Sequence, residues 1–259
     1  MLRSKKDVQS IRHEPGFVPS KLGLAALSWV DVLRTLSTIV IGTWGLNVGL
    51  SVILFRGLTW PGSSASKLAF FFLLQTTIPV IVCWTTMKRK GEPAFWKLQI
   101  TKIASTHVLV SLILGVVLAS FMAAIIRWDS ASSSLQTTLI NTILKDMHSR
   151  IAFAVVLVLS CTLEEMFLRG YLFPFVRARS GFIAGLLALV LWLASDFLPR
   201  FPGPWYWIGT TLWFALLVKH VVLTIQRELS SSLLPPMLTH LVCNLLIASL
   251  VLGVFGTGH

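Results

Sequence analysis

Two adjacent glutamates and an arginine lie inside an otherwise apolar segment of the chain. Glu164, Glu165 and Arg169 occur in the stretch CTLEEMFLRGYLFP, which continues an apolar run that begins at Ile151. A charged side chain at the centre of a bilayer costs roughly 2.5–3.5 kcal/mol on insertion scales, so such residues usually face a bundle interior or a water-filled cavity. Residues four apart share a helix face, so Glu165 and Arg169 are predicted to pair. Glu164 then points about 100° away from Glu165, into a separate space.

A carboxylate in such a cavity suits proton transfer from water, because a positioned side chain can act there as a general base. This favours Glu164 as the base, with Glu165 largely neutralised by Arg169. From these residues alone, a structural salt bridge that holds helices together and leaves a spare acid is an equally good interpretation.

A histidine and an asparagine share one face of the last apolar segment. His240 and Asn244, in the stretch HLVCN, are four residues apart. An imidazole and a carboxamide can together donate hydrogen bonds to a developing oxyanion. A single buried histidine is more often a satisfied core residue, but the pair on one helix face favours a functional site.

The combination of EEMFLRG with a downstream HLVCN resembles the CPBP family of intramembrane proteases. This family includes the CAAX prenyl proteases of the Ras-converting type and the bacterial bacteriocin-processing and immunity proteins. Its first motif, E-E-x-x-x-R, is met by Glu164, Glu165 and Arg169, and its last motif, H-x-x-x-N, is met by His240 and Asn244. The resemblance covers about 100 residues, from Ile151 to roughly Leu250, and leaves the first three apolar segments without a motif.

The middle motif of the family, F-x-x-x-H, is replaced here. Trp192 takes the place of its phenylalanine and Asp196 the place of its histidine. The resemblance implies peptide hydrolysis in which the first glutamate activates water, helped by the middle histidine, while the last histidine and the asparagine stabilise the oxyanion. An ionised aspartate cannot donate a hydrogen bond. Either Asp196 is protonated, pairs with Lys219 or His220, or holds a water or a cation, or else the site is inactive.

The sequence therefore predicts an intramembrane endopeptidase of the CPBP type that cleaves a membrane-associated peptide or protein substrate. The expected site residues are Glu164, Glu165, Arg169, Asp196, His240 and Asn244. The alternative is a catalytically impaired scaffold or immunity protein. A transporter or channel with an acid and histidine relay is a third class. No organic cofactor is implied, and whether the acids and the histidine bind a divalent metal stays open.

Composition places these residues in a membrane protein. The chain is 55% apolar and only 12% charged, whereas a soluble domain carries about 25% charge. The formal net charge of +12 is spread over short loops between apolar runs, which predicts contact with anionic lipid head groups and argues against nucleic acid as a partner.

The expected fold is all-α, a polytopic helix bundle of about seven transmembrane helices. A spanning helix needs roughly 20 mostly apolar residues. The less apolar segment Ser130–Arg150 is expected either as an interfacial amphipathic helix or as a solvated helix packed on the bundle. The predicted spans are Thr35–Phe55, Leu68–Met87, His107–Ile126, Ile151–Val176, Gly181–Leu198, Trp205–Ile225 and Leu233–Phe255.

Three regions are expected: a basic cytoplasmic tail over residues 1–34, N-terminal transmembrane helices with the amphipathic segment over 35–150, and a CPBP-like core over 151–255. The first twenty residues are polar and basic, so we expect the first span to be retained as an anchor. Lysine and arginine concentrate in the N-terminal tail and in the second and fourth loops, which predicts a cytoplasmic N-terminus. The membrane would be the plasma membrane of a bacterium or the endoplasmic reticulum of a eukaryote.

Overall fold

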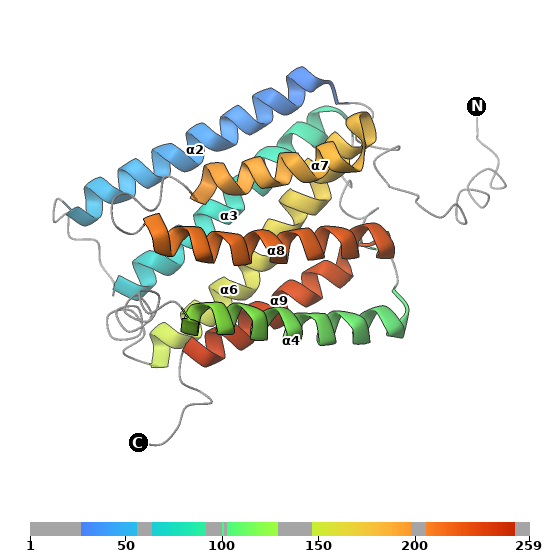
Figure 1. Cartoon of the computed structure of the whole chain (residues 1–259). Helices are drawn as coiled ribbons and strands as arrows, with labels where there is room; N and C mark the ends of the chain where they lie inside the picture. Colours follow the sequence, from blue (N-terminus) through green and yellow to red (C-terminus); the bar gives the residue numbers. More distant parts are fainter. Residues whose placement is uncertain are drawn as a thin grey trace, which may run out of the picture.

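A computed structural model describes residues 27–55, 64–91, 100, 103–128, 147–197 and 206–251. These residues form seven α-helices and one π-helical segment, η5, with no strand among them, and the helices gather into one bundle (Figure 1). The predicted all-α class is therefore confirmed for this part of the chain. The elements are α2 (Trp29–Phe55), α3 (Ser64–Arg89), α4 (Ser105–Trp128), α6 (Met147–Phe167), η5 (Leu168–Leu172), α7 (Phe173–Phe197), α8 (Tyr206–Ser230) and α9 (Leu234–Val251).

Each predicted span lies largely within a helix. In the described part of the chain, two helical stretches are long and apolar enough to cross a membrane, Ser105–Ile125 and Ala154–Ala194. Large apolar side chains such as Leu109, Ile113 and Val117 point outward from the first of these, as expected for a helix that faces lipid. The count of seven spans stays a prediction, and most of the segment Ser130–Arg150 lies outside the described residues.

The fourth predicted span contains a distorted stretch of helix, and a break in α7 follows at the start of the fifth. The backbone changes from α- to π-helical over Leu168–Leu172 and then enters α7. Gly181 breaks α7 with φ 87°, a conformation that glycine adopts without the steric cost of a Cβ atom. A Cβ atom on Gly185 would meet the Phe173 ring at 3.0 Å. Twelve residues of straight helix would separate these two positions by about 18 Å, so the chain folds back at Gly181.

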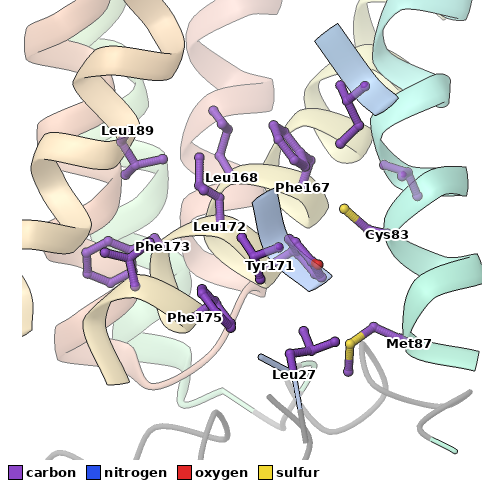
Figure 2. Packing of buried hydrophobic residues seen from close by; sticks show 14 residues of the cluster. Leu27, Cys83, Met87, Phe167, Leu168, Tyr171, Leu172, Phe173, Phe175 and Leu189 are labelled. Atoms are coloured by element: carbon purple, nitrogen blue, oxygen red, sulfur yellow. The ribbon is translucent and has the colours of Figure 1, made fainter. Parts of the chain in front are cut away.

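The largest hydrophobic cluster surrounds η5. Figure 2 shows Leu168, Tyr171 and Leu172 of η5 in one cluster with Cys83 and Met87 of α3. All five residues of η5 are buried. The core therefore fixes the orientation of the segment that carries Arg169.

Three polar contacts gather helix ends at one end of the bundle. Lys90 Nζ lies 2.9 Å from the Asp31 carboxylate, which joins the end of α3 to the start of α2. Arg177 pairs with Glu228 at 2.5 Å, and Arg179 donates to the carbonyl of Leu27. Lys90, Arg177 and Arg179 are among the bases that were predicted to be cytoplasmic, so the structure brings these described residues to the same end of the bundle. Which side of a membrane they occupy stays a prediction.

Candidate active site

The predicted pair of Glu165 and Arg169 forms in the middle of the bundle. Arg169 Nη1 donates to Glu165 Oε1 at 2.5 Å, and both side chains are fully buried. Glu165 lies in the last turn of α6, and Arg169 lies in η5. A buried charge is tolerated when it is paired and hydrogen-bonded. This buried ion pair therefore holds α6 and η5 in a fixed relation and anchors the other polar side chains of the site.

Arg169 also determines which ring nitrogen of His220, on α8, carries the proton. Its Nη2 donates to the backbone carbonyl of His220 at 2.9 Å and lies 2.8 Å from His220 Nδ1. A guanidinium group can only donate hydrogen bonds, so Nδ1 accepts and the ring proton is on Nε2. That Nε2–H faces Glu164 Oε1 at 3.3 Å.

Glu164 is the accessible acid of the cluster. Its side chain is 31% exposed, whereas Glu165, one residue later, is fully buried. The other Glu164 oxygen, Oε2, lies 3.9 Å from His240 Nε2. The two glutamates thus take the separate positions that the helix geometry predicted, and Glu164 is the one that a substrate or a water molecule can reach.

His240 connects α9 to both neighbouring helices. Its Nδ1 lies 2.8 Å from Glu165 Oε1, and its Nε2 lies 2.9 Å from Lys219 Nζ on α8. A lysine ammonium can only donate hydrogen bonds, so Nε2 of His240 accepts from Lys219 and the ring proton is on Nδ1. His240 is then neutral, donating from Nδ1 to the Glu165 carboxylate and accepting at Nε2 from Lys219.

Local sequence signals place α9 so that His240 reaches this cluster. Three serines and two leucines precede the proline pair, and α9 begins at Leu234 with Pro235 and Pro236 in its first turn. Pro is favoured there because its missing N–H would have no helical partner. Ser232 Oγ accepts from Leu234 N at 3.3 Å. One turn further, Thr239 donates to the carbonyl of Ser111 at 3.1 Å, which ties α9 to α4.

Asn244 lies one turn beyond His240 and makes a different contact. Its Nδ2 donates to Cys161 Sγ at 2.9 Å. Cys161 lies one turn before Glu165, so α6 and α9 meet in two successive contacts, Cys161 with Asn244 and Glu165 with His240. In this structure Asn244 links α9 to α6 and so helps to set the position of one helix along the other. Its part in oxyanion stabilisation stays a prediction.

Of the two middle-motif residues, the structure describes the side chain of Trp192. Trp192 of α7 packs edge-on against Phe167, with ring centroids 4.8 Å apart. Asp196 lies in the last turn of α7, but its side chain is outside the described part of the structure, and its role stays a prediction. The histidine that meets Glu164 comes from α8. From the sequence, Lys219 and His220 were considered only as possible partners of Asp196, and the structure brings both into the cluster.

The donors of the cluster do not suit a divalent cation. Among the described residues, no three His, Cys, Asp or Glu side chains are arranged to hold a metal ion. His220 Nδ1 and both His240 nitrogens already have hydrogen-bond partners, and Lys219 adds a positive charge.

The segment that builds this cluster matches a known family. Residues 146–246 match the Rce1-like family, described as type II CAAX prenyl endopeptidase Rce1-like. This confirms the resemblance to the CPBP family that the two motifs carry. The Rce1-like family is a family of membrane-embedded proteases, and the two apolar helical stretches fit that setting. No curated protein and no solved structure matches the chain.

Proposed function

We propose that the chain is an intramembrane endopeptidase of the CAAX protease type, in which Glu164 activates the attacking water. One observation carries the proposal. The partly exposed Glu164 carboxylate receives the Nε2–H of His220 at 3.3 Å and lies 3.9 Å from His240, while its neighbour Glu165 is neutralised by Arg169. Glu164 is thus held in place and accessible, whereas Glu165 has a structural role in the ion pair.

The chemistry follows from this arrangement. Glu164 takes a proton from a water molecule as the water oxygen bonds to the carbonyl carbon of the scissile peptide. The resulting tetrahedral intermediate carries a negative oxygen. When the C–N bond breaks, the same proton passes from Glu164 to the leaving amine, so a carboxylic acid and an amine are produced and Glu164 is again a carboxylate. The acid product then loses its proton to the amine or to water.

His220 is a positioning residue in this scheme. Its Nε2–H faces Glu164, and Arg169 keeps the ring proton on that nitrogen. Its hydrogen bond orients the carboxylate toward the position of the attacking water. The role that the family gives to a histidine at position 196 is therefore supplied from α8.

The proposed substrate is a peptide segment that reaches the cluster from the bilayer or from the cytoplasmic face. The family description makes a prenylated CAAX terminus the first class to try. A catalytically impaired scaffold is the rival proposal. It gives no reason for an accessible carboxylate beside a histidine whose proton is held toward it.

The test is cleavage of a farnesylated, fluorophore-labelled CAAX peptide by the purified full chain in lipid vesicles. Glu164→Gln should lower kcat by at least about a hundredfold, because it removes the general base. Glu228→Gln is the matched control, since Glu228 pairs with Arg177 near the end of α8, and it should keep wild-type activity. Equal cleavage by wild type and Glu164→Gln would overturn the proposal. Lack of cleavage of both this peptide and its unprenylated form by the folded wild type would favour the scaffold.

A further inference from the structure

Lys219 is a buried cation whose side-chain partner is a histidine. It is 4% exposed, and its Nζ lies 2.9 Å from His240 Nε2. A buried ammonium ordinarily pairs with a carboxylate, because removing the charge from water is costly. The nearby buried carboxylate, Glu165, is engaged by Arg169 and His240 instead. A charge held in this way requires an explanation beyond packing.

Both ring nitrogens of His240 are already engaged, so the ring has no N–H group left to donate to a substrate. Its Nδ1–H is directed at Glu165, and its Nε2 lone pair receives Lys219. A histidine in this state cannot donate to the negative oxygen of a tetrahedral intermediate. The oxyanion donor that the family resemblance assigns to His240 must therefore be another group.

Lys219 has the donors that His240 lacks. An ammonium carries three N–H groups, and the contact with His240 uses one of them. We propose that Lys219 is the catalytic residue that stabilises the oxyanion, with His240 as the positioning residue that holds its ammonium in place. This inference rests on the proposed protease function and names the group that binds the negative oxygen.

The position of Lys219 relative to the base supports this role. His240 Nε2 is 2.9 Å from Lys219 Nζ and 3.9 Å from Glu164 Oε2. The ammonium and the water-activating carboxylate therefore meet at the same ring nitrogen. A carbonyl there can be attacked from the Glu164 side while its oxygen faces Lys219, which is the relation that base and oxyanion donor need.

Charge balance leads to the same conclusion. Glu164 and Glu165 are two negative groups, Arg169 and Lys219 are two positive groups, and both histidines are neutral. With proton transfer to Glu164, negative charge moves from its carboxylate to the oxyanion. Lys219 then faces the new charge in a buried site, where electrostatic stabilisation is stronger than in water.

A binding measurement tests the role without catalysis. The Glu164→Gln protein in vesicles is titrated with two farnesylated peptides of one sequence, which differ only in that a phosphonate replaces the scissile peptide bond in one. The phosphonate is tetrahedral and anionic, like the intermediate. It should bind more tightly than the amide peptide, and adding Lys219→Met should weaken phosphonate binding by about a hundredfold while the amide affinity changes little.

Lys88→Met is the matched control, because Lys88 lies over the Trp84 ring near the end of α3. It should keep the preference for the phosphonate. An unfolded variant would lose both ligands together, so thermal unfolding is followed in parallel. Where Lys219→Met does not fold, Lys219→Gln replaces it. Retention of the full phosphonate preference by the folded variant overturns the inference.

Activity separates this inference from the proposed function. In the otherwise wild-type chain, Lys219→Met should lower kcat by about 10²–10³ with a smaller change in KM, and Lys219→Arg should keep part of the rate. If Glu164→Gln leaves cleavage unchanged, the proposed function fails. If Glu164→Gln abolishes cleavage but the Lys219 variants cleave like wild type, the oxyanion role of Lys219 fails and the role of Glu164 as the general base stands.

Discussion

The Nε2 atom of His220 lies 3.3 Å from Oε1 of Glu164, although the two residues belong to different helices, α8 and α6. This contact gives the accessible glutamate a histidine partner in a chain whose middle motif has an aspartate. The aspartate at position 196 therefore does not by itself indicate an inactive protein, because Glu164 has a histidine hydrogen-bond donor on another helix.

Removing His220 should impair catalysis more than substrate binding. His220→Leu should lower kcat by about tenfold to a hundredfold with little change in KM, because Glu164 loses the group that orients it. His220→Gln should recover part of the rate, since its side-chain nitrogen can donate toward Glu164 in place of Nε2. Steady-state cleavage of the farnesylated peptide measures both parameters, and a change confined to KM would rule out this role.

Position 196 provides the complementary test. Asp196→His should change the rate of the protein that contains His220 by less than about threefold, because Glu164 already has its donor. A large gain of cleavage from a slow parent would show instead that position 196 is where the family histidine is needed.

Arg169 should be the most important single residue for stability in the site. It bonds Glu165 and both the ring and the carbonyl of His220. Arg169→Met leaves a buried carboxylate without its cation, which should lower the free energy of unfolding by about 3–5 kcal/mol. Arg34→Met, on an exposed position of α2, should have little effect. Denaturant unfolding in mixed micelles gives both values, and equal stabilities for the two variants would contradict the description of the site.

The packing of α4 against α9 should control the position of His240. A Cβ atom on Gly115 would lie 2.8 Å from Val242 Cβ and 3.0 Å from the Thr239 carbonyl oxygen. Gly115→Ala should therefore cost about 1–3 kcal/mol of stability and reduce cleavage as α9 shifts. Gly45→Ala is the control, because no heavy atom lies within 4 Å of its added Cβ. Equal stability and activity in the two variants would show that this contact is not tight.

The start of α2 should show a pH dependence of its own. A hydrogen bond from the Ser28 backbone N–H, helped by Lys90, lowers the pKa of Asp31 from 3.8 to about 2. A group with a lowered pKa stabilises the fold above its unfolded value, and this contribution is lost as the pH falls through the folded value. Asp31→Asn should lower the Tm at pH 6, and the difference should close between about pH 4 and pH 2. A Tm difference that is constant with pH would contradict this assignment.

Helix periodicity was sufficient to predict part of the site. The spacing of Glu165 and Arg169 determines their pairing within one continuous stretch of helix, and the same spacing separates Glu164 from Glu165. The proline pair before His240 likewise marks where α9 begins. These features are local, so they follow from residue types and from the rise of a helix.

The contributions of Lys219 and His220 could not be predicted in this way. They are adjacent on α8, yet one contacts His240 on α9 and the other contacts Arg169 and Glu164. Which side chain meets which helix depends on how α8 packs against α6 and α9, and hydrophobic pattern does not specify that packing. The π-helical turn that carries Arg169 also leaves no periodic signal. The contact of Asn244 with Cys161 depends on the relative shift of α6 and α9 along their axes.

The central claim is that Glu164 delivers water to the scissile carbonyl. The most direct measurement is mass spectrometry of the products formed from the farnesylated CAAX peptide in ¹⁸O-labelled water by the wild-type protein and by Glu164→Gln. We predict that the wild-type product carries one ¹⁸O atom in its new carboxylate and that the folded Glu164→Gln protein yields at least about a hundredfold less of it. Labelled product formed at the wild-type rate by Glu164→Gln would contradict the claim.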